Sequence, residues 1–167
     1  LPEGFAPAEE LRAALTADVQ KVQFVGVAGT AGKTAAAGLL AAILREAAFH
    51  VGFYRAGCEP LSARIAIGGV SVDPVLLCQA AEALSAAKPL PREAAELAAA
   101  ARCFGAAGCK LAVVELPDAG LASALPNMPV CAVTAIGPDG VSRSVERLAA
   151  LAAGVMRKDA VCVTAPE

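Results

Sequence analysis

One short segment combines glycines, a lysine and a threonine in an order typical of phosphate binding. It lies between a β-rich run (residues 22–27) and an Ala- and Leu-rich stretch (residues 35–48). A glycine turn between a strand and a helix can direct several backbone N–H groups, and the positive end of the helix dipole, at one point where an anion can sit. We therefore expect a phosphate-binding loop made of Gly29, Thr30, Ala31, Gly32, Lys33 and Thr34.

Two side chains in this loop support the same interpretation. Lys33 adds a full positive charge, and the Thr34 hydroxyl can coordinate a Mg²⁺ ion that bridges two phosphates. Val27 stands where the general Walker pattern has its first glycine, so the match is to the shorter G-x-x-G-K-T core. The alternative is a glycine turn with a solvated lysine, but a turn at this junction has no structural need for the lysine.

Two other polar residues are candidates for chemistry. Glu115 ends an apolar run (residues 110–115), and ligands of open α/β sheets bind at the carboxyl ends of the strands. Its carboxylate could hold Mg²⁺, since one or two carboxylates plus phosphates are the usual ligands of that ion, or it could simply be satisfied by a neighbouring loop. His50 is the single histidine and precedes a strand away from other polar groups, which favours a surface position.

The elements that must position these residues alternate between strand-like and helix-like patterns from Gln20 onward. We expect strands over 22–27, 50–54, 110–115, 130–134 and 160–164, and helices over 8–16, 35–48, 74–87, 92–107 and 144–155. Residues 64–67 and 70–72 around Gly68-Gly69 predict a β-hairpin, and Asp73-Pro74 predicts a helix start. The expected fold is a three-layer α/β/α sandwich of the P-loop, Rossmann-like type, with a mostly parallel sheet and a small hairpin insertion, in a single domain over residues 1–167.

Composition excludes several classes of protein. The chain is 57% hydrophobic, but 42 of its 167 residues are alanine, and its longest apolar run is about half of what a bilayer span needs. A net charge of −2 leaves no basic stripe for nucleic acid. Six cysteines without a C-x-x-C pair indicate reduced thiols, and no signal peptide is visible in residues 1–10, so we expect a cytoplasmic protein with neither a membrane nor a nucleic acid as partner.

The loop and its continuation resemble the ATP-binding (central) domain of the Mur ligase superfamily, most closely that of folylpolyglutamate synthase. The resemblance starts at Val27 and extends through the 64–72 hairpin, the strand ending at Glu115, residues 133–137, Ala153-Gly154-Val155 and residues 163–166. It implies ATP-dependent amide-bond formation through an acyl phosphate. By position, residues 29–34 would hold the triphosphate, Lys33 would act catalytically by stabilising the transferred charge, and Thr34 and Glu115 would serve Mg²⁺.

The sequence departs from that family at several positions. Ala31 replaces a usual Asn, residues 135–140 lack the Asp-His pair and place Gly140 where a metal-binding histidine is expected, and Ala152 stands where a lysine is expected. The loops 55–60 and 116–120 also lack the family's signatures, and the separate C-terminal ligase domain is missing from the chain. We therefore expect a nucleotide-binding domain in which ATP·Mg²⁺ binding is retained and ligase activity is impaired or lost.

Two alternatives stay open. The chain could be a non-catalytic scaffold or interaction module that binds no nucleotide and forms a homo-oligomer or pairs with another protein. It could also be one part of a split ligase whose missing domain is supplied by a separate partner protein.

Overall fold

The expected alternation of strands and helices is present in the computed structural model, which describes residues 6–85, 89–138 and 144–165. The strands are β1 (Gln23–Ala28), β2 (Val51–Tyr54), β3 (Ile65–Ile67), β4 (Val70–Ser71), β5 (Leu111–Glu115), β6 (Val130–Val133) and β7 (Val161–Thr164). The α-helices are α1 (Ala6–Ala14), α2 (Lys33–Glu46), α3 (Pro74–Ser85), α4 (Arg92–Ala106) and α5 (Val145–Ala152). Short 3₁₀ helices lie at η1 (Val19–Lys21), η2 (Leu61–Ala63), η3 (Ala119–Ala124) and η4 (Ala153–Val155).

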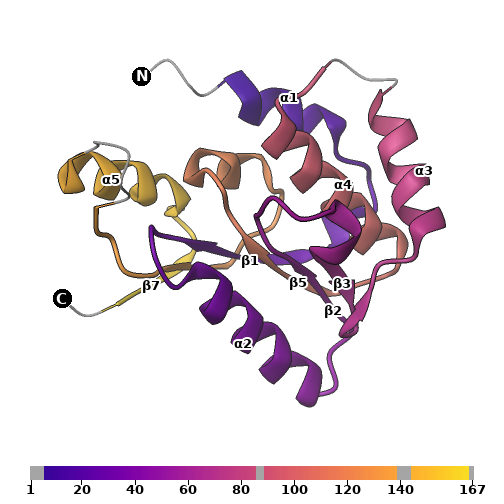
Figure 1. Cartoon of the computed structure of the whole chain (residues 1–167), viewed down its shortest axis with the longest axis horizontal. Helices are drawn as coiled ribbons and strands as arrows, with labels where there is room; N and C mark the ends of the chain where they lie inside the picture. The colour runs from indigo at the N-terminus through magenta and orange to yellow at the C-terminus, as the bar shows by residue number, and fades with distance from the viewer. Residues whose placement is uncertain (1–5, 86–88, 139–143, 166–167) are drawn as a thin grey trace.

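All strands of the described chain join one sheet in the order β4-β3-β2-β5-β1-β6-β7. Strands β2, β5, β1, β6 and β7 run parallel, and the β3–β4 hairpin adds to one edge in antiparallel fashion. The predicted mostly parallel sheet with a hairpin insertion is therefore confirmed. Strand β1 lies between β5 and β6, so the segment that follows it emerges at the middle of the sheet (Figure 1).

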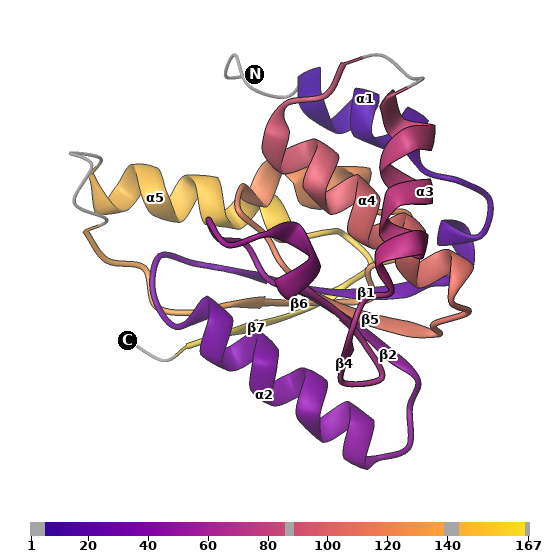
Figure 2. The ribbon, with the colours of Figure 1, turned by 45° about the vertical axis from the view of Figure 1, so that its right-hand side comes forward.

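Helices cover both faces of the sheet, as a three-layer sandwich requires. Of the described helices, α2 alone packs on one face, and α1, α3, α4 and α5 lie on the other, as Figures 1 and 2 show from two directions. Side chains along β1 point alternately to the two faces of the sheet. Val25 and Val27 face α2, whereas Phe24 belongs to the core under α4. The larger core holds Phe24, Phe104 and Leu97, all fully buried.

The local turn and cap signals are also confirmed. Gly68 and Gly69 take φ angles of 60° and 86° in the β3–β4 turn, which a residue with a side chain would adopt only with strain. The Asp73 side chain accepts a hydrogen bond of 2.7 Å from the backbone N–H of Val75 and so caps the start of α3. Ser144 accepts from the backbone N–H of Arg147 and caps α5 in the same way.

The segment after β5 differs from the expected irregular loop. Residues 119–124 form η3, whose start is capped by Asp118, since its side chain accepts a 2.8 Å bond from the N–H of Gly120. The small apolar side chains of this segment point inward, and Leu121, Ala122 and Ala124 are buried. The less buried residues of η3, Gly120 and Ser123, are three positions apart, but six residues are too few for this spacing to indicate a helix in the sequence. No helix in the described residues is long and apolar enough to cross a membrane.

Candidate functional site

The segment of residues 29–34, here called the glycine loop, connects the end of β1 to the start of α2. Gly29 has a φ of 132°, and a Cβ at this position would lie 2.2 Å from the Thr134 hydroxyl oxygen. Gly32 has a φ of 79° and is the N-cap residue of α2. Both glycines are thus required by the backbone path, the first for close approach to β6 and the second for its left-handed conformation.

Hydrogen bonds anchor the first half of the glycine loop to the segment after β6. The backbone N–H groups of Thr30 and Ala31 donate to the carbonyl oxygen of Ala135, at 3.0 and 3.3 Å. The Thr134 hydroxyl bonds to the carbonyl oxygens of Ala28 (3.1 Å) and Ala31 (2.7 Å). The amides of Thr30 and Ala31 therefore point at protein acceptors and away from a common anion position, unlike the expectation that the whole loop would present its amides.

The second half of the loop keeps its amides available. The first backbone bond of α2 runs from the N–H of Ala36 to the carbonyl oxygen of Gly32 (2.9 Å). In the described part of the chain no backbone carbonyl accepts from the N–H groups of Gly32, Lys33 and Thr34, as expected for the open first turn of a helix. These three amides lie at the positive end of a 14-residue helix and are open donors of the kind that can bind an anion.

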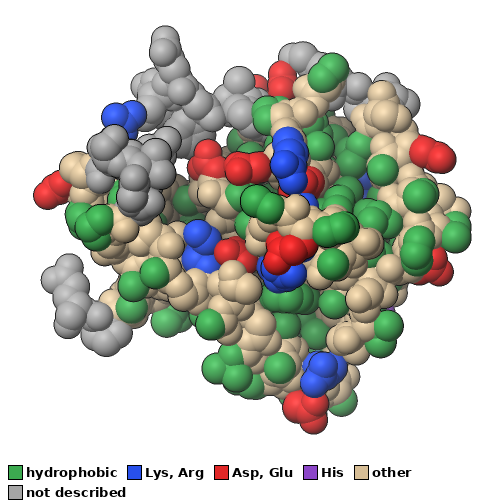
Figure 3. Space-filling model, in the orientation of Figure 1, with side chains coloured by type: hydrophobic (Ala, Val, Ile, Leu, Met, Phe, Trp, Pro, Cys, Tyr) green, Lys and Arg blue, Asp and Glu red, His purple; other side chains and the backbone are tan. Residues whose placement is uncertain are grey.

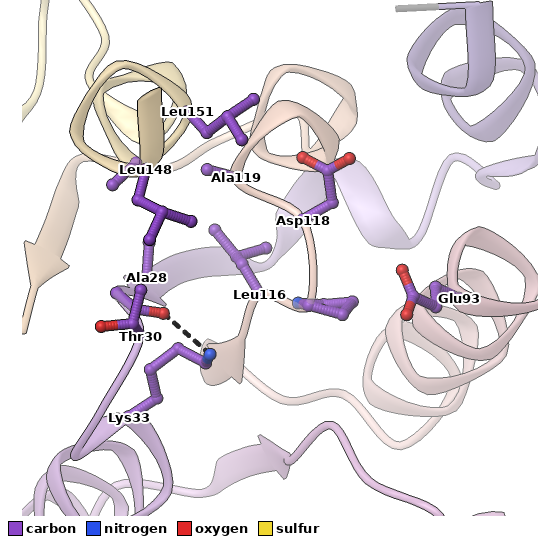
Figure 4. A pocket seen from close by; sticks show the side chains of 12 residues that line it. Ala28, Thr30, Lys33, Glu93, Leu116, Asp118, Ala119, Leu148 and Leu151 are labelled. Atoms are coloured by element: carbon purple, nitrogen blue, oxygen red, sulfur yellow. Dashed lines mark hydrogen bonds between the residues drawn. The ribbon is translucent and has the colours of Figure 1, made fainter. Parts of the chain in front are cut away.

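Lys33 extends from the first turn of α2 toward a cavity of about 410 Å³. Its ammonium donates a 2.8 Å hydrogen bond to the carbonyl oxygen of Gly29 (Figure 4). The lysine is thus bonded to a neutral acceptor of its own loop and not to a carboxylate, so an arriving anion would not have to displace a competing negative charge. The bond also keeps the ammonium beside the backbone of the glycine loop.

Thr34 and Glu115, the two residues predicted to serve a metal, are in direct contact. The Thr34 hydroxyl donates a 3.0 Å hydrogen bond to the Glu115 carboxylate, which is 4% exposed. Val27 and Glu115 pair across β1 and β5, so sheet register brings this carboxylate beside the glycine loop. Hydroxyl and carboxylate oxygens are the ligand type that Mg²⁺ prefers. The described residues contain no group of three or more His, Cys, Asp or Glu side chains that could hold a metal, so an ion here would take its remaining ligands from phosphate and water.

The cavity next to Lys33 is lined from several elements. Figure 4 shows Lys33 and Thr30 on one side and Asp118 and Glu93 across from them, with Leu148 and Leu151 of α5 closing another wall. On the molecular surface, side chains of both charge signs gather at the middle of this face (Figure 3). The cavity therefore offers one cation, two carboxylates and an apolar wall to a ligand.

Sequence reasoning missed the residues that support the loop. In the sequence, Thr134 is only the last residue of an expected strand, and Asp118 and Glu93 belong to no motif. The order of strands in the sheet is what brings Thr134 to β1, and this order was not visible in the sequence. Ala152, where the resemblance expects a lysine, lines the same cavity. His50 is exposed, as predicted, while the Asp139-Gly140 positions lie outside the described residues.

Comparison with known proteins supports the fold. No protein-family model and no curated protein sequence matches the chain. Among solved structures, the chain is similar to E. coli FolC in complex with DHPP and ADP, with a TM-score of 0.84, 19% identity, and 98% of this chain aligned with 42% of that chain. It is also similar to folylpolyglutamate synthase from Thermotoga maritima (TM-score 0.81, 16% identity, 98% of this chain and 41% of that one). A third is folylpolyglutamate synthase from Mycobacterium tuberculosis complexed with ADP, with a TM-score of 0.78, 22% identity, and 96% of this chain aligned with 40% of that chain.

The predicted resemblance to folylpolyglutamate synthase is thus confirmed at the level of the fold. The chain spans about two fifths of the length of these proteins. At such sequence identity the likeness establishes the α/β architecture, and what those proteins do remains a proposal for this chain.

Proposed function

We propose that this chain is a nucleotide-binding domain that holds ATP and Mg²⁺ at the glycine loop. The observation that carries the proposal is the meeting of three open amides (residues 32–34), the Lys33 ammonium and the Thr34–Glu115 pair at the end of β1. Three of the similar structures contain ADP, and one is a complex with AMPPCP and folate. A nucleotide in those proteins supports the same ligand class here.

The phosphates would be bound by the amides at the start of α2 and by Lys33. The Lys33 ammonium would exchange its neutral acceptor, the Gly29 carbonyl, for a phosphate oxygen, and a charge-assisted bond is about twice as strong as a neutral one. Because Thr30 and Ala31 bond to Ala135, their amides hold the shape of the loop and would not contact the ligand directly. The phosphate-binding set is therefore narrower than the full run of residues 29–34.

Thr34 and Glu115 would hold the magnesium ion. A bound Mg²⁺ would neutralise phosphate charge and orient the terminal phosphoryl group. The oxygens of these two side chains lie 3.0 Å apart, so both can face one ion once the hydroxyl proton turns away from the carboxylate. No large movement of either strand or helix is needed.

In the similar family the nucleotide drives amide-bond formation through an acyl phosphate, and we propose that this activity is impaired or lost here. Ala152 places a methyl group in the cavity where the resemblance expects a lysine, next to the apolar side chains of Leu148 and Leu151. Loss of one preorganised charged group at an active site typically costs on the order of a hundred- to a thousandfold in rate. Lys33 would then stabilise bound phosphate without supporting turnover.

A second candidate is a non-catalytic interaction module that binds no nucleotide. It is favoured by hydrogen bonds that already occupy donors of the glycine loop: two amides donate to Ala135 and the Lys33 ammonium donates to Gly29. In this case the loop would connect β1 to α2 without binding a ligand. The two functions differ in a single measurable property, which is the affinity for ATP.

Calorimetric titration of ATP with Mg²⁺ into the chain and into Lys33→Ala separates the two candidates. If the loop binds ATP, Lys33→Ala should weaken binding at least about tenfold, the usual effect of removing a bond to a charged group. Lys21→Ala is a matched control, because Lys21 forms a surface ion pair with Asp18 just before β1, at the opposite end of that strand from the loop. Equal, weak heats for the chain and for Lys33→Ala would exclude nucleotide binding and favour the interaction module.

A further inference from the structure

Two arginine side chains from distant parts of the chain converge on one carbonyl oxygen. Arg12 of α1 donates to the carbonyl oxygen of Ser123 in η3, and Arg157, which follows η4, donates to the same atom at 3.3 Å. Two donors that share one acceptor lie within about 6 Å of each other, given hydrogen-bond lengths of about 3 Å. The two guanidinium groups therefore form a pair of like charges at the corner where α1, η3 and η4 meet.

This pair has no carboxylate to balance it within the described residues. The ion pairs there involve other arginines, namely Arg45, Arg55, Arg64 and Arg92, and a lysine. Burial, and then the positive charge of Arg12, lower the pKa of Arg157 below its ordinary value. A neutral carbonyl between two cations leaves their mutual repulsion uncompensated.

Within the part of the chain that the structure describes, most N–H groups of this pair have no further acceptor. Each guanidinium carries five N–H groups, and one from each is spent on Ser123. Arg12 is exposed and Arg157 is half-buried, so the pair is open to solvent from the side of α1. Guanidinium groups match the oxygens of carboxylates and phosphates in a bidentate geometry.

We propose that Arg12 and Arg157 form a binding site for an oxyanion of the phosphate or carboxylate class. The anion lies between the two guanidinium groups, accepts from both, and removes their repulsion. This site is separate from the glycine loop, and it stands whether or not the loop binds a nucleotide. The two regions are connected by η3, since Asp118 caps the start of η3 and lines the Lys33 cavity while Ser123 lies near its end.

A single arginine is enough to attach one element to a neighbouring carbonyl oxygen. Arg102 shows this, because its guanidinium alone donates a 3.0 Å bond to the carbonyl oxygen of Ala14 at the end of α1. That contact attaches a helix end with one cation. A second cation on Ser123 adds repulsion without adding a new acceptor, and this is the feature that an anion explains.

The site can be tested by following backbone amide signals in NMR spectra during titration with inorganic phosphate and, separately, with acetate. The expected result is a saturable shift of the Ser123 and Ala124 signals with at least one anion, weakened at least about tenfold in Arg12→Gln and in Arg157→Gln. Added sodium chloride should weaken the binding, because partly exposed charges are screened. Phosphate without acetate would identify the phosphate class, and binding of both would identify a general oxyanion site.

Two controls separate this site from other effects. Arg102→Gln also loses one arginine–carbonyl bond, so it should keep the Ser123 response. Lys33→Ala should remove any phosphate response of residues 32–34 and leave that of Ser123 intact. This control distinguishes failure of the Arg12–Arg157 site from failure of the nucleotide site. Absence of a saturable shift at Ser123 in the unmodified chain would overturn the proposal, even if the arginine variants unfold, and so would an equal response in folded arginine variants.

Discussion

The Thr34 hydroxyl and the Glu115 carboxylate are joined by a 3.0 Å hydrogen bond although 81 residues separate them in the chain. The contact exists because β5 lies beside β1 in the sheet and ends level with it, while α2 begins directly above that edge. A hydroxyl at a helix start and a carboxylate at a strand end thereby face one another. Their chemistry can be separated by variants that change one oxygen at a time.

Thr34→Val should remove the magnesium dependence of ATP binding. The substitution keeps the shape of the side chain but deletes the oxygen that would face the ion, and it leaves the buried carboxylate of Glu115 without its donor. We expect Mg²⁺ to strengthen ATP binding at least about tenfold in the unmodified chain and much less in the variant. Calorimetry with ATP in Mg²⁺ and in a chelator measures this ratio.

Thr34→Ser is the control for that experiment, because serine retains the hydroxyl and should retain most of the magnesium effect. If Thr34→Val kept the full effect, Thr34 would not be a metal ligand, and Glu115 would have to be tested alone through Glu115→Gln.

Gly29→Ala should disrupt the glycine loop. The new methyl group would lie 2.2 Å from the Thr134 hydroxyl oxygen and 3.2 Å from the Thr134 backbone, so the loop or β6 must shift. We expect a loss of about 1–3 kcal/mol in the free energy of unfolding, the usual cost of overpacking, together with weaker ATP binding. Urea-induced unfolding followed by circular dichroism measures the first effect.

Gly38→Ala is the matched control, since a Cβ at Gly38, inside α2, meets no atom within 4 Å. Replacing a helix-interior glycine by alanine should stabilise the chain by up to about 1 kcal/mol. Similar effects of the two substitutions would mean that the close approach of Gly29 to Thr134 does not constrain the loop.

The sequence was sufficient to locate the glycine loop and Glu115, because both depend on signals that are local. A glycine turn between a strand and a helix needs no tertiary information, and a polar residue at the end of a buried strand lies at the ligand-binding edge of any parallel sheet. The direction of individual amides is different. Thr30 and Ala31 turn toward Ala135 because β6 happens to be the other neighbour of β1, and strand order is not encoded in local patterns.

The same reason explains the missed support of the site. In the sequence, Thr134 is the last residue of a β-rich run. Its hydroxyl supports the loop only because the fold brings it against Gly29. The cavity beside Lys33 is lined by the end of β1, the glycine loop, α4, residues 116–119 and α5, and these regions share no motif. The six-residue η3 is too short for its spacing of buried residues to be recognised in the sequence, so its position between α1 and η4 could not be predicted either.

Glu96→Ala should destabilise the chain much more than Arg92→Ala does. Glu96 bonds at 2.8 Å to Arg64, which is 1% exposed, and at 2.9 Å to Arg92, whose side chain is 69% exposed. Removing Glu96 leaves a buried guanidinium without a counter-charge, which typically costs about 3–5 kcal/mol. Removing Arg92 breaks a mostly exposed pair, which is worth at most about 1 kcal/mol. Urea unfolding of both variants at pH 7 measures the difference, and equal losses would mean that Arg64 does not depend on Glu96.

This carboxylate should also make stability depend on acidic pH. Burial by itself would raise the pKa of Glu96, but the bonds from Arg64 and Arg92 outweigh it and hold the pKa below the ordinary 4.5. Because the folded-state pKa is the lower one, the stabilisation is complete above about pH 4.5 and is lost as the pH falls through the folded-state value. The fall in stability below pH 4.5 should be shallower in Glu96→Ala than in the unmodified chain, and parallel curves would contradict this assignment.

Four of the six cysteines should divide into two classes when the folded chain meets a disulfide reagent at pH 8. Cys58 and Cys78 are exposed and should react quickly, whereas Cys103 and Cys109 are buried and should react only on unfolding. Burial also raises the pKa of both buried thiols from 9.0 to about 11, which lowers the fraction of reactive thiolate.

The same pKa shift predicts the response to alkaline pH. Since the folded-state pKa is the higher one, the stabilisation from keeping Cys103 and Cys109 neutral is complete below pH 9 and is lost as the pH rises through about 11. Unfolding curves between pH 8 and 11 should show this loss, and replacing both residues by alanine should make it shallower even if the variant is less stable at pH 8. An equally steep loss in the double variant, or rapid labelling of Cys103 in the folded chain, would mean that this part of the core admits solvent.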